Sequence, residues 1–220
     1  MERRNFVRNI GAGALFLGLG GVSYAFDRDK NKDKLKKHKK HITILHTNDT
    51  HSHIDPMPTD DPHYPDKGGV ARRAVLVEQV RQENPNTLLF DAGDIFQGTP
   101  YFNYYGGELE FRLMSMLKYD AATFGNHDFD NGIEGLLFQM PHAKFDFISS
   151  NYDFTNTVLE GKTKPYKVFE VDEVRIGVYG LGVELKGLVT KELYRETKYL
   201  DPVEIAIDME KKLRKTENCD

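Results

Sequence analysis

The sequence predicts an α/β fold, in which short strands alternate with helices and form a sheet that helices cover. Apolar runs of strand length occur at 42–47, 87–92 and 121–124, and polar residues follow each of them. The segments between these runs are long enough to hold helices. Regular alternation of this kind favours parallel strands joined by crossover helices.

The expected elements can be placed in order along the chain. They are strand 42–47, helix 69–83, strand 87–91, helix 106–118, strand 121–124, short helix 131–138, strand 145–149, strands 166–171 and 174–181, and helix 202–217. Only Asp172 and Glu173 separate the last two strands, which predicts a hairpin. We therefore expect a mixed sheet whose antiparallel members come late in the chain.

The last expected helix is amphipathic. Its apolar residues near one face are Val203, Ala206, Ile207 and Leu213. Such a face normally packs on the core. A further strand should follow in an alternating pattern, so we expect the fold to be incomplete at the C-terminus.

Composition divides the chain into three parts. With 220 residues and 39% hydrophobic residues, one domain over 42–220 is expected. Residues 1–26 combine paired arginines with an apolar, glycine-rich run, which predicts a twin-arginine export signal and a periplasmic or cell-envelope location. A membrane anchor is the alternative, but the run is short for roughly 30 Å of hydrocarbon, so no stable membrane span is expected after signal cleavage. Residues 27–41 read as a Lys-rich disordered linker.

Charge and cysteine content exclude some classes. From residue 42 onward, 19 basic residues stand against 30 acidic ones, a formal balance of −11. A nucleic acid is therefore not expected as the main partner, because binding a phosphate backbone needs a basic surface. The single Cys219 forms no internal disulfide. No particular oligomeric state is predicted.

Potential metal ligands follow three of the expected strands. They are Asp49, His51, Asp94 and Asn126. The carboxyl ends of parallel strands meet at one edge of a sheet, so these side chains should converge. Asp49 and His51 are two residues apart and point the same way in extended chain. Asp94 has two carboxylate oxygens that could bridge ions about 3.5 to 4 Å apart. Mixed oxygen and nitrogen donors favour Mn, Zn, Co or Fe.

Three longer segments carry a family resemblance. They read ILHTNDTH at 44–51, DAGDIFQGTP at 91–100 and YDAATFGNHDFD at 119–130, and GGVARR at 68–73 leads into the first expected helix. Together they resemble the 5′-nucleotidase branch of the calcineurin-like metallophosphatases. The resemblance implies a β-sandwich flanked by helices and two divalent metal ions.

The resemblance also implies roles for individual residues. Asp49 and His51 would bind the first metal, Asp94 would bridge, and Asn126 would bind the second. His127 and Asp130 would form the catalytic pair. Asp128 stands where relatives usually have Glu, and we expect little consequence because that position is not a ligand. Asn151, at a later strand end, is a candidate for orienting substrate, whereas Arg72 and Arg73 are expected on a solvated helix face.

Further ligands of the family are missing from this chain. The family completes its site with a later histidine and a GHxH segment, and His142 is the only histidine after His127. It follows Pro141 and matches neither pattern. The chain is therefore expected to be the N-terminal portion of a metallophosphatase domain.

The expected function is hydrolysis of a small phosphoester, most simply a nucleotide, by a water that two metals activate. Three alternatives stay open. One is a catalytically inactive fragment that binds metal or ligand. The others are a related cyclic-nucleotide phosphodiesterase and a nucleotide-sugar hydrolase, which would share the same motifs.

Overall fold

A computed structural model describes residues 39–220 of the chain. The expected export signal over 1–26 and most of the expected linker over 27–41 lie outside the described residues. Lys40, at the end of that linker, forms an ion pair with Glu173, with 2.6 Å between Nζ and Oε2. Among the described helices, none combines the length and apolarity that a membrane span needs.

The central sheet is parallel and has four strands. They are β1 (Thr43–Thr47), β2 (Thr87–Asp91), β3 (Ala121–Ala122) and β4 (Asp146–Phe147), in that spatial order. The register pairs Thr47 with Asp91 and Asp91 with Ala122. The carboxyl ends of the first three strands therefore lie level at one edge of the sheet, as predicted.

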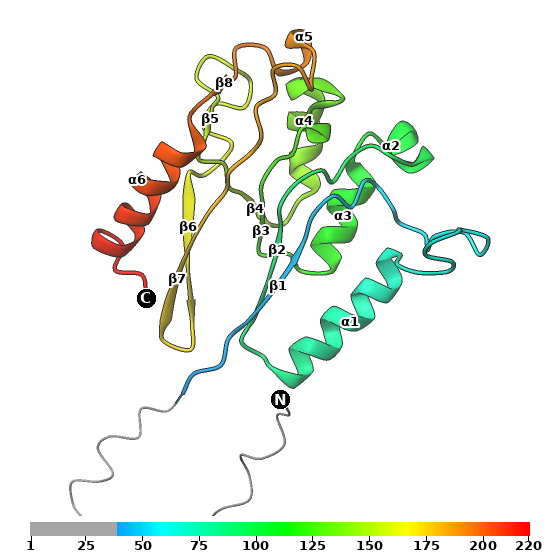
Figure 1. Cartoon of the computed structure of the whole chain (residues 1–220), viewed down its shortest axis with the longest axis horizontal. Helices are drawn as coiled ribbons and strands as arrows, with labels where there is room; N and C mark the ends of the chain where they lie inside the picture. The colour runs from blue at the N-terminus through cyan, green and yellow to red at the C-terminus, as the bar shows by residue number, and fades with distance from the viewer. Residues whose placement is uncertain (1–38) are drawn as a thin grey trace, which may run out of the picture. The chain divides into compact units, whose positions relative to one another are not determined.

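Helices cover one face of this sheet. They are α1 (Val70–Glu83), α3 (Glu108–Met116) and α4 (Gly132–Gln139), and Figure 1 shows them on the side opposite the late hairpin. A short helix, α2 (Pro100–Tyr105), precedes α3 and was not predicted. Its proline occupies the first turn, where the missing N–H costs nothing.

The predicted hairpin is present on the other face. Strands β6 (Tyr166–Val171) and β7 (Val174–Tyr179) pair antiparallel, and the Phe169 ring packs 5.4 Å from that of Phe90 in β2. The antiparallel strands come late in the chain, as predicted, and form sheets separate from the parallel one. A second small pair, β5 (Tyr152–Asp153) with β8 (Lys198–Tyr199), and the short helix α5 (Lys191–Tyr194) were also not predicted.

The last helix, α6 (Pro202–Lys215), buries only part of the predicted face, at Leu213 and the half-buried Ala206. Val203 and Ile207 are 66% and 61% exposed, whereas Leu213 is 5% exposed. Leu213 packs against β7 so closely that a Cβ on Gly177 would lie 2.8 Å from its Cδ2 atom. The half-buried residues between, Ile205 and Met209, complete a stripe at helical spacing.

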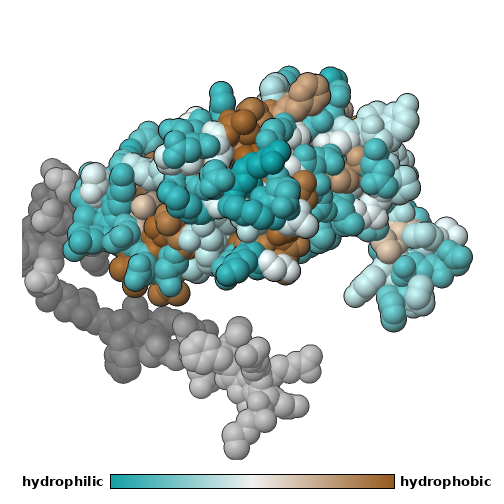
Figure 2. Space-filling view, turned by 90° about the horizontal axis from the view of Figure 1, so that it is seen from above, coloured by the Kyte–Doolittle hydropathy of each residue, from teal (hydrophilic) through white to brown (hydrophobic). Residues whose placement is uncertain are grey.

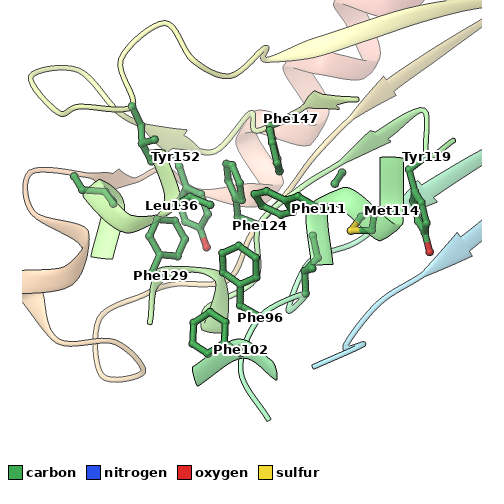
Figure 3. Close-up of a cluster of buried hydrophobic side chains, with 14 of the residues drawn as sticks. Phe96, Phe102, Phe111, Met114, Tyr119, Phe124, Phe129, Leu136, Phe147 and Tyr152 are labelled. Atoms are coloured by element: carbon green, nitrogen blue, oxygen red, sulfur yellow. The ribbon is translucent and has the colours of Figure 1, made fainter. Parts of the chain in front are cut away.

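The core lies between the sheet and α1, α3 and α4 and is rich in aromatic rings (Figure 3). Phe124 stacks on Phe147 with 5.0 Å between ring centroids, and Phe111 lies 5.1 Å from Phe147. Phe124 and Phe129 are 1% and 0% exposed and bracket the segment that contains His127. The core therefore fixes the loop after β3 from both ends.

The surface is largely polar. Figure 2 shows a mostly hydrophilic face on which hydrophobic patches are small and separated. Isolated exposed apolar residues such as Met116 and Phe138 are common on protein surfaces and carry no functional meaning alone.

Candidate metal centre

Three of the predicted ligands converge at the carboxyl edge of the sheet. Asp49 and His51 follow β1, and Asp94 follows β2, and one donor atom from each lies within 4.8 Å of the other two. The Nε2 atom of His51 is 3.8 Å from an Asp49 carboxylate oxygen. Oxygen and nitrogen donors at this separation suit a divalent transition metal, so the residues present fit the ion that the motifs imply.

The backbone places these side chains through an unusual conformation. Asp49, His51 and Asp94 all have positive φ angles, of 49°, 43° and 55°. Left-handed backbone is costly for residues other than glycine and persists where surrounding contacts enforce it. Here the two loops bond to each other: Asp49 N–H donates to the Gly93 carbonyl, and His51 N–H donates to that of Asp94, at 2.9 and 3.0 Å.

Two glycines permit the loops to approach this closely. A Cβ on Gly125 would lie 2.2 Å from an Asp94 carboxylate oxygen. A Cβ on Gly98 would lie 2.7 Å from the carbonyl oxygen of His51. Side chains at either position would displace a candidate ligand, which explains the glycines in the two motifs.

The predicted catalytic pair adjoins the cluster. The backbone N–H of His127 donates to the Asp94 carboxylate at 2.9 Å. The ring Nδ1 atom of His127 lies 2.9 Å from an Asp130 carboxylate oxygen. The hydrogen bond to Asp130 raises the pKa of His127 above its usual value. The His51 and His127 rings are 5.1 Å apart, edge to face. Asn126 is half-buried at the start of the short 3-10 helix His127–Phe129 and directly precedes His127.

Asp128 has a role that the sequence did not predict. It is 1% exposed, and its carboxylate accepts hydrogen bonds from backbone N–H groups. The donors are Asp94, Ile95, Phe96 and Gly125, at 2.9 to 3.1 Å. Burial raises its carboxyl pKa to about 7 despite these bonds. Asp128 thus joins the loop after β3 to the loop that carries Asp94.

Arg73 does not lie on a solvated helix face, contrary to our expectation. It is half-buried, and its guanidinium donates to the Tyr119 hydroxyl at 3.4 Å. It also lines an open pocket that contains Asp49. Arg72 does face solvent, as expected, and pairs with Asp66 through both carboxylate oxygens, at 2.9 and 3.0 Å.

The predicted substrate residue Asn151 is separate from this group. It is fully buried, its amide donates to the Gly182 carbonyl at 2.9 Å, and its side-chain oxygen accepts from Gly182 N–H at 2.8 Å. No face of the side chain is open to a substrate, which does not fit the predicted contact. Asn151 instead ties the segment after β4 to the segment after β7.

Known proteins share this sheet and its motifs. The family model for calcineurin-like phosphoesterases matches residues 42–209. The chain belongs to the calcineurin-like phosphoesterase family. A snake venom 5′-nucleotidase of Naja atra is 40% identical over 146 residues, which cover 63% of this chain and 28% of that protein. The human 5′-nucleotidase is 41% identical over 147 residues, which cover 63% of this chain and 26% of that protein.

Solved structures agree with this assignment. A 5′-nucleotidase precursor from Thermus thermophilus superposes with a TM-score of 0.71 and 37% identity, covering 78% of this chain and 34% of that one. An NAD nucleotidase from Haemophilus influenzae superposes with a TM-score of 0.72 and 31% identity, covering 80% of this chain and 32% of that one. The chain thus spans about a quarter to a third of the length of these relatives.

Proposed function

We propose that this chain carries part of the active site of a metal-dependent phosphoester hydrolase that releases phosphate from nucleotides. The observation that carries the proposal is the convergence of Asp49, His51 and Asp94 beside the His127–Asp130 pair. Membership of the phosphoesterase family and identity to several 5′-nucleotidases support it.

The proposed metal centre contains two ions from the set Mn, Zn, Co and Fe. Asp49 and His51 would hold the first, Asp94 would bridge, and Asn126 would contribute to the second. When bound, divalent ions neutralise the charge on the phosphoryl group and acidify a water molecule. The protein contributes the rigid loops that keep these donors together.

The proposed role of His127 is to supply a proton or positive charge to the oxygen of the leaving group. Its Nδ1 is bonded to Asp130, which orients the ring and favours the protonated form through the raised pKa. Its Nε2 then donates to an oxygen of the substrate. Groups in this position typically contribute about 10² to 10⁴ in rate.

The substrate is proposed to be a nucleoside 5′-monophosphate or a similar small phosphoester. The relatives named above include 5′-nucleotidases and an NAD nucleotidase, and this chain's own residues set only the phosphoester chemistry. We also propose export by a twin-arginine signal over 1–26, which N-terminal sequencing of the protein from the periplasm will test.

Titration of the purified, metal-free chain with Mn²⁺ tests the metal site, and phosphate release from AMP tests the activity. Asp94→Asn should reduce Mn²⁺ affinity at least about 10-fold, because the bridging charge is lost. Asp60→Asn, at an exposed acidic residue outside the cluster, is the matched control. Equal Mn²⁺ binding by both variants would contradict the metal site. Mn²⁺ binding without phosphate release from AMP, other nucleotides or cyclic nucleotides would favour an inactive binding module.

A further inference from the structure

Glu110 is a charged residue in the interior of the domain. It lies in α3, one of the helices that cover the parallel sheet, and it is 4% exposed. Its neighbours on the helix, Phe111 and Met114, belong to the hydrophobic core. Carboxylates are rarely buried without partners, because their desolvation costs several kcal/mol. A residue kept here against that cost needs a specific explanation.

Within residues 39–220, only one side-chain oxygen of Glu110 has a protein partner. The Ser52 hydroxyl donates to Oε1, whereas no donor among the described residues reaches Oε2, which is itself buried. A cavity of about 20 Å³ adjoins this carboxylate. Arg73 and His53 line it, and it has room for one water molecule. The carboxylate therefore has a small, mainly apolar cavity on one side and a single fixed contact, Ser52, on the other.

Ser52 directly follows the candidate ligand His51, and contacts hold it on every side. It is 2% exposed and has a positive φ of 57°. Its N–H donates to the Ile95 carbonyl at 2.9 Å. The Thr99 hydroxyl donates to its carbonyl oxygen at 2.8 Å and lies 3.0 Å from its hydroxyl. These contacts fix the backbone of Ser52 and the peptide group that joins it to His51.

We propose that Glu110 is a positioning residue for the metal centre. It accepts the Ser52 hydrogen and so fixes the strained backbone that aims the His51 imidazole at Asp49 and Asp94. The proposal rests on the proposed metal site. Outer partners that orient a ligand typically account for about 10- to 100-fold in metal affinity.

Three variants separate positioning from general stability. Glu110→Leu removes the acceptor and keeps much of the volume. Glu110→Gln keeps an acceptor for Ser52. Met114→Ala is the matched control, because Met114 is 5% exposed and lines the same cavity but does not bond to the loop. All three are compared in the full metal-free chain by amide hydrogen exchange and by Mn²⁺ titration.

Glu110→Leu should speed exchange of the His51 and Ser52 amides and weaken Mn²⁺ binding about 10-fold or more. Glu110→Gln should resemble the parent, and Met114→Ala should lower the melting temperature without either effect. If Glu110→Leu does not fold, Ser52→Ala removes the same hydrogen bond and should give the same two changes.

Two results would overturn the proposal. One is parental exchange at Ser52 in both Glu110→Leu and Ser52→Ala. The other is an equal effect of Met114→Ala on exchange and affinity. A parent chain that binds no Mn²⁺ would instead refute the metal site, while the exchange data would still show whether Glu110 fixes the loop.

Discussion

Single side chains at this site are held mainly by backbone groups. Asp128 accepts four backbone N–H groups, and Asp94 accepts that of His127. The carboxylates of Asp49 and Asp94 lie together with the imidazole of His51 in one cluster. A carboxylate pair arranged in this way is favourable when a cation joins it, which is the electrostatic basis of the proposed metal centre.

His127→Asn separates the proposed catalytic role from a ligand role. The ring of His127 is bonded to Asp130 and does not belong to the cluster of Asp49, His51 and Asp94. We expect Mn²⁺ content near that of the parent and nucleotide hydrolysis lowered by about 100-fold or more. Metal analysis measures the Mn²⁺ content, and a phosphate-release assay measures the rate of nucleotide hydrolysis. Loss of metal in this variant would mean that His127 is a ligand.

The buried Asp91 makes a prediction about pH. Burial raises its carboxyl pKa to about 6, although the Thr47 hydroxyl and Gly93 N–H donate to it at 2.5 and 2.8 Å. The unfolded chain loses this proton near pH 4. The folded state therefore holds the proton longer, and the stability that Asp91 contributes at low pH is lost as the pH rises from about 4 to about 6.

Asp91→Asn should remove this dependence. An amide can accept from Gly93 N–H and donate to Thr47, whose hydroxyl can in turn donate to Tyr119, 2.7 Å away. Relative to the parent, the metal-free variant should gain on the order of 2 kcal/mol in unfolding free energy between pH 4 and pH 7. Urea unfolding at several pH values measures the difference in unfolding free energy between variant and parent. Groups that titrate in the same way in both proteins do not contribute to this difference. Parallel pH profiles for the two proteins would contradict the prediction.

At the scale of elements, the sequence was informative where a pattern is local. Strands β1 and β2, helix α1 and the β6–β7 hairpin lie within two residues of their predicted bounds. Strands β5 and β8 have two residues each, and each exists only because the other pairs with it far along the chain. No local pattern signals such a pair.

The buried face of α6 shows a second limit. Val203 and Ile207 fit an apolar face as well as Leu213 does, yet the helix turns Leu213 inward. The close approach to Gly177 decides the orientation, and that contact comes from a different element. Periodicity thus predicted the helix, and tertiary packing chose its buried side.

The candidate site divides in the same way. Ligand spacing and strand ends predicted Asp49, His51 and Asp94, because side-chain chemistry and sheet topology suffice to bring them together. The hydrogen bonds from backbone N–H groups to Asp128, and the bond between Ser52 and Glu110, form only when segments far apart in the sequence meet in space. Their sequence signals are weak: an acidic residue after His127, and one acidic residue within an apolar helix face.

The N-cap of α6 allows a test of one element alone. The Asp201 carboxylate accepts from Val203 and Glu204 N–H at 2.8 and 3.1 Å. Asp201→Ala should lower the unfolding free energy by about 1 kcal/mol, since two N–H groups lose their partner. Asp208→Ala, at an exposed position of the same helix, is the control and should change it by less than about 0.5 kcal/mol. Urea unfolding distinguishes the two, and equal losses would show that capping contributes nothing here.

At the scale of the whole domain, core and site are continuous. The side chain of Phe124 lies in the aromatic core (Figure 3). The residues that follow it form the turn that carries Asn126 and His127. Phe129 returns the chain to the same core. The ligand loops are therefore built on rigid packing, although their own backbone conformations are strained.

Metal binding should consequently stabilise the entire domain. An ion that binds only the folded state adds RT ln(1 + [L]/Kd), or about 2.7 kcal/mol at 100 times Kd. Thermal unfolding of the chain should shift upward with Mn²⁺ concentration, and EDTA should reverse the shift. Asp94→Asn should reduce the shift to about half or less, because about 10-fold weaker binding leaves about 1.4 kcal/mol at the same Mn²⁺ concentration, whereas Asp60→Asn should keep it. A melting temperature independent of Mn²⁺ in the parent, at concentrations where titration shows binding, would mean that the ion binds the unfolded chain equally well. In that case the loops around Asp49 and Asp94 would not be the binding site.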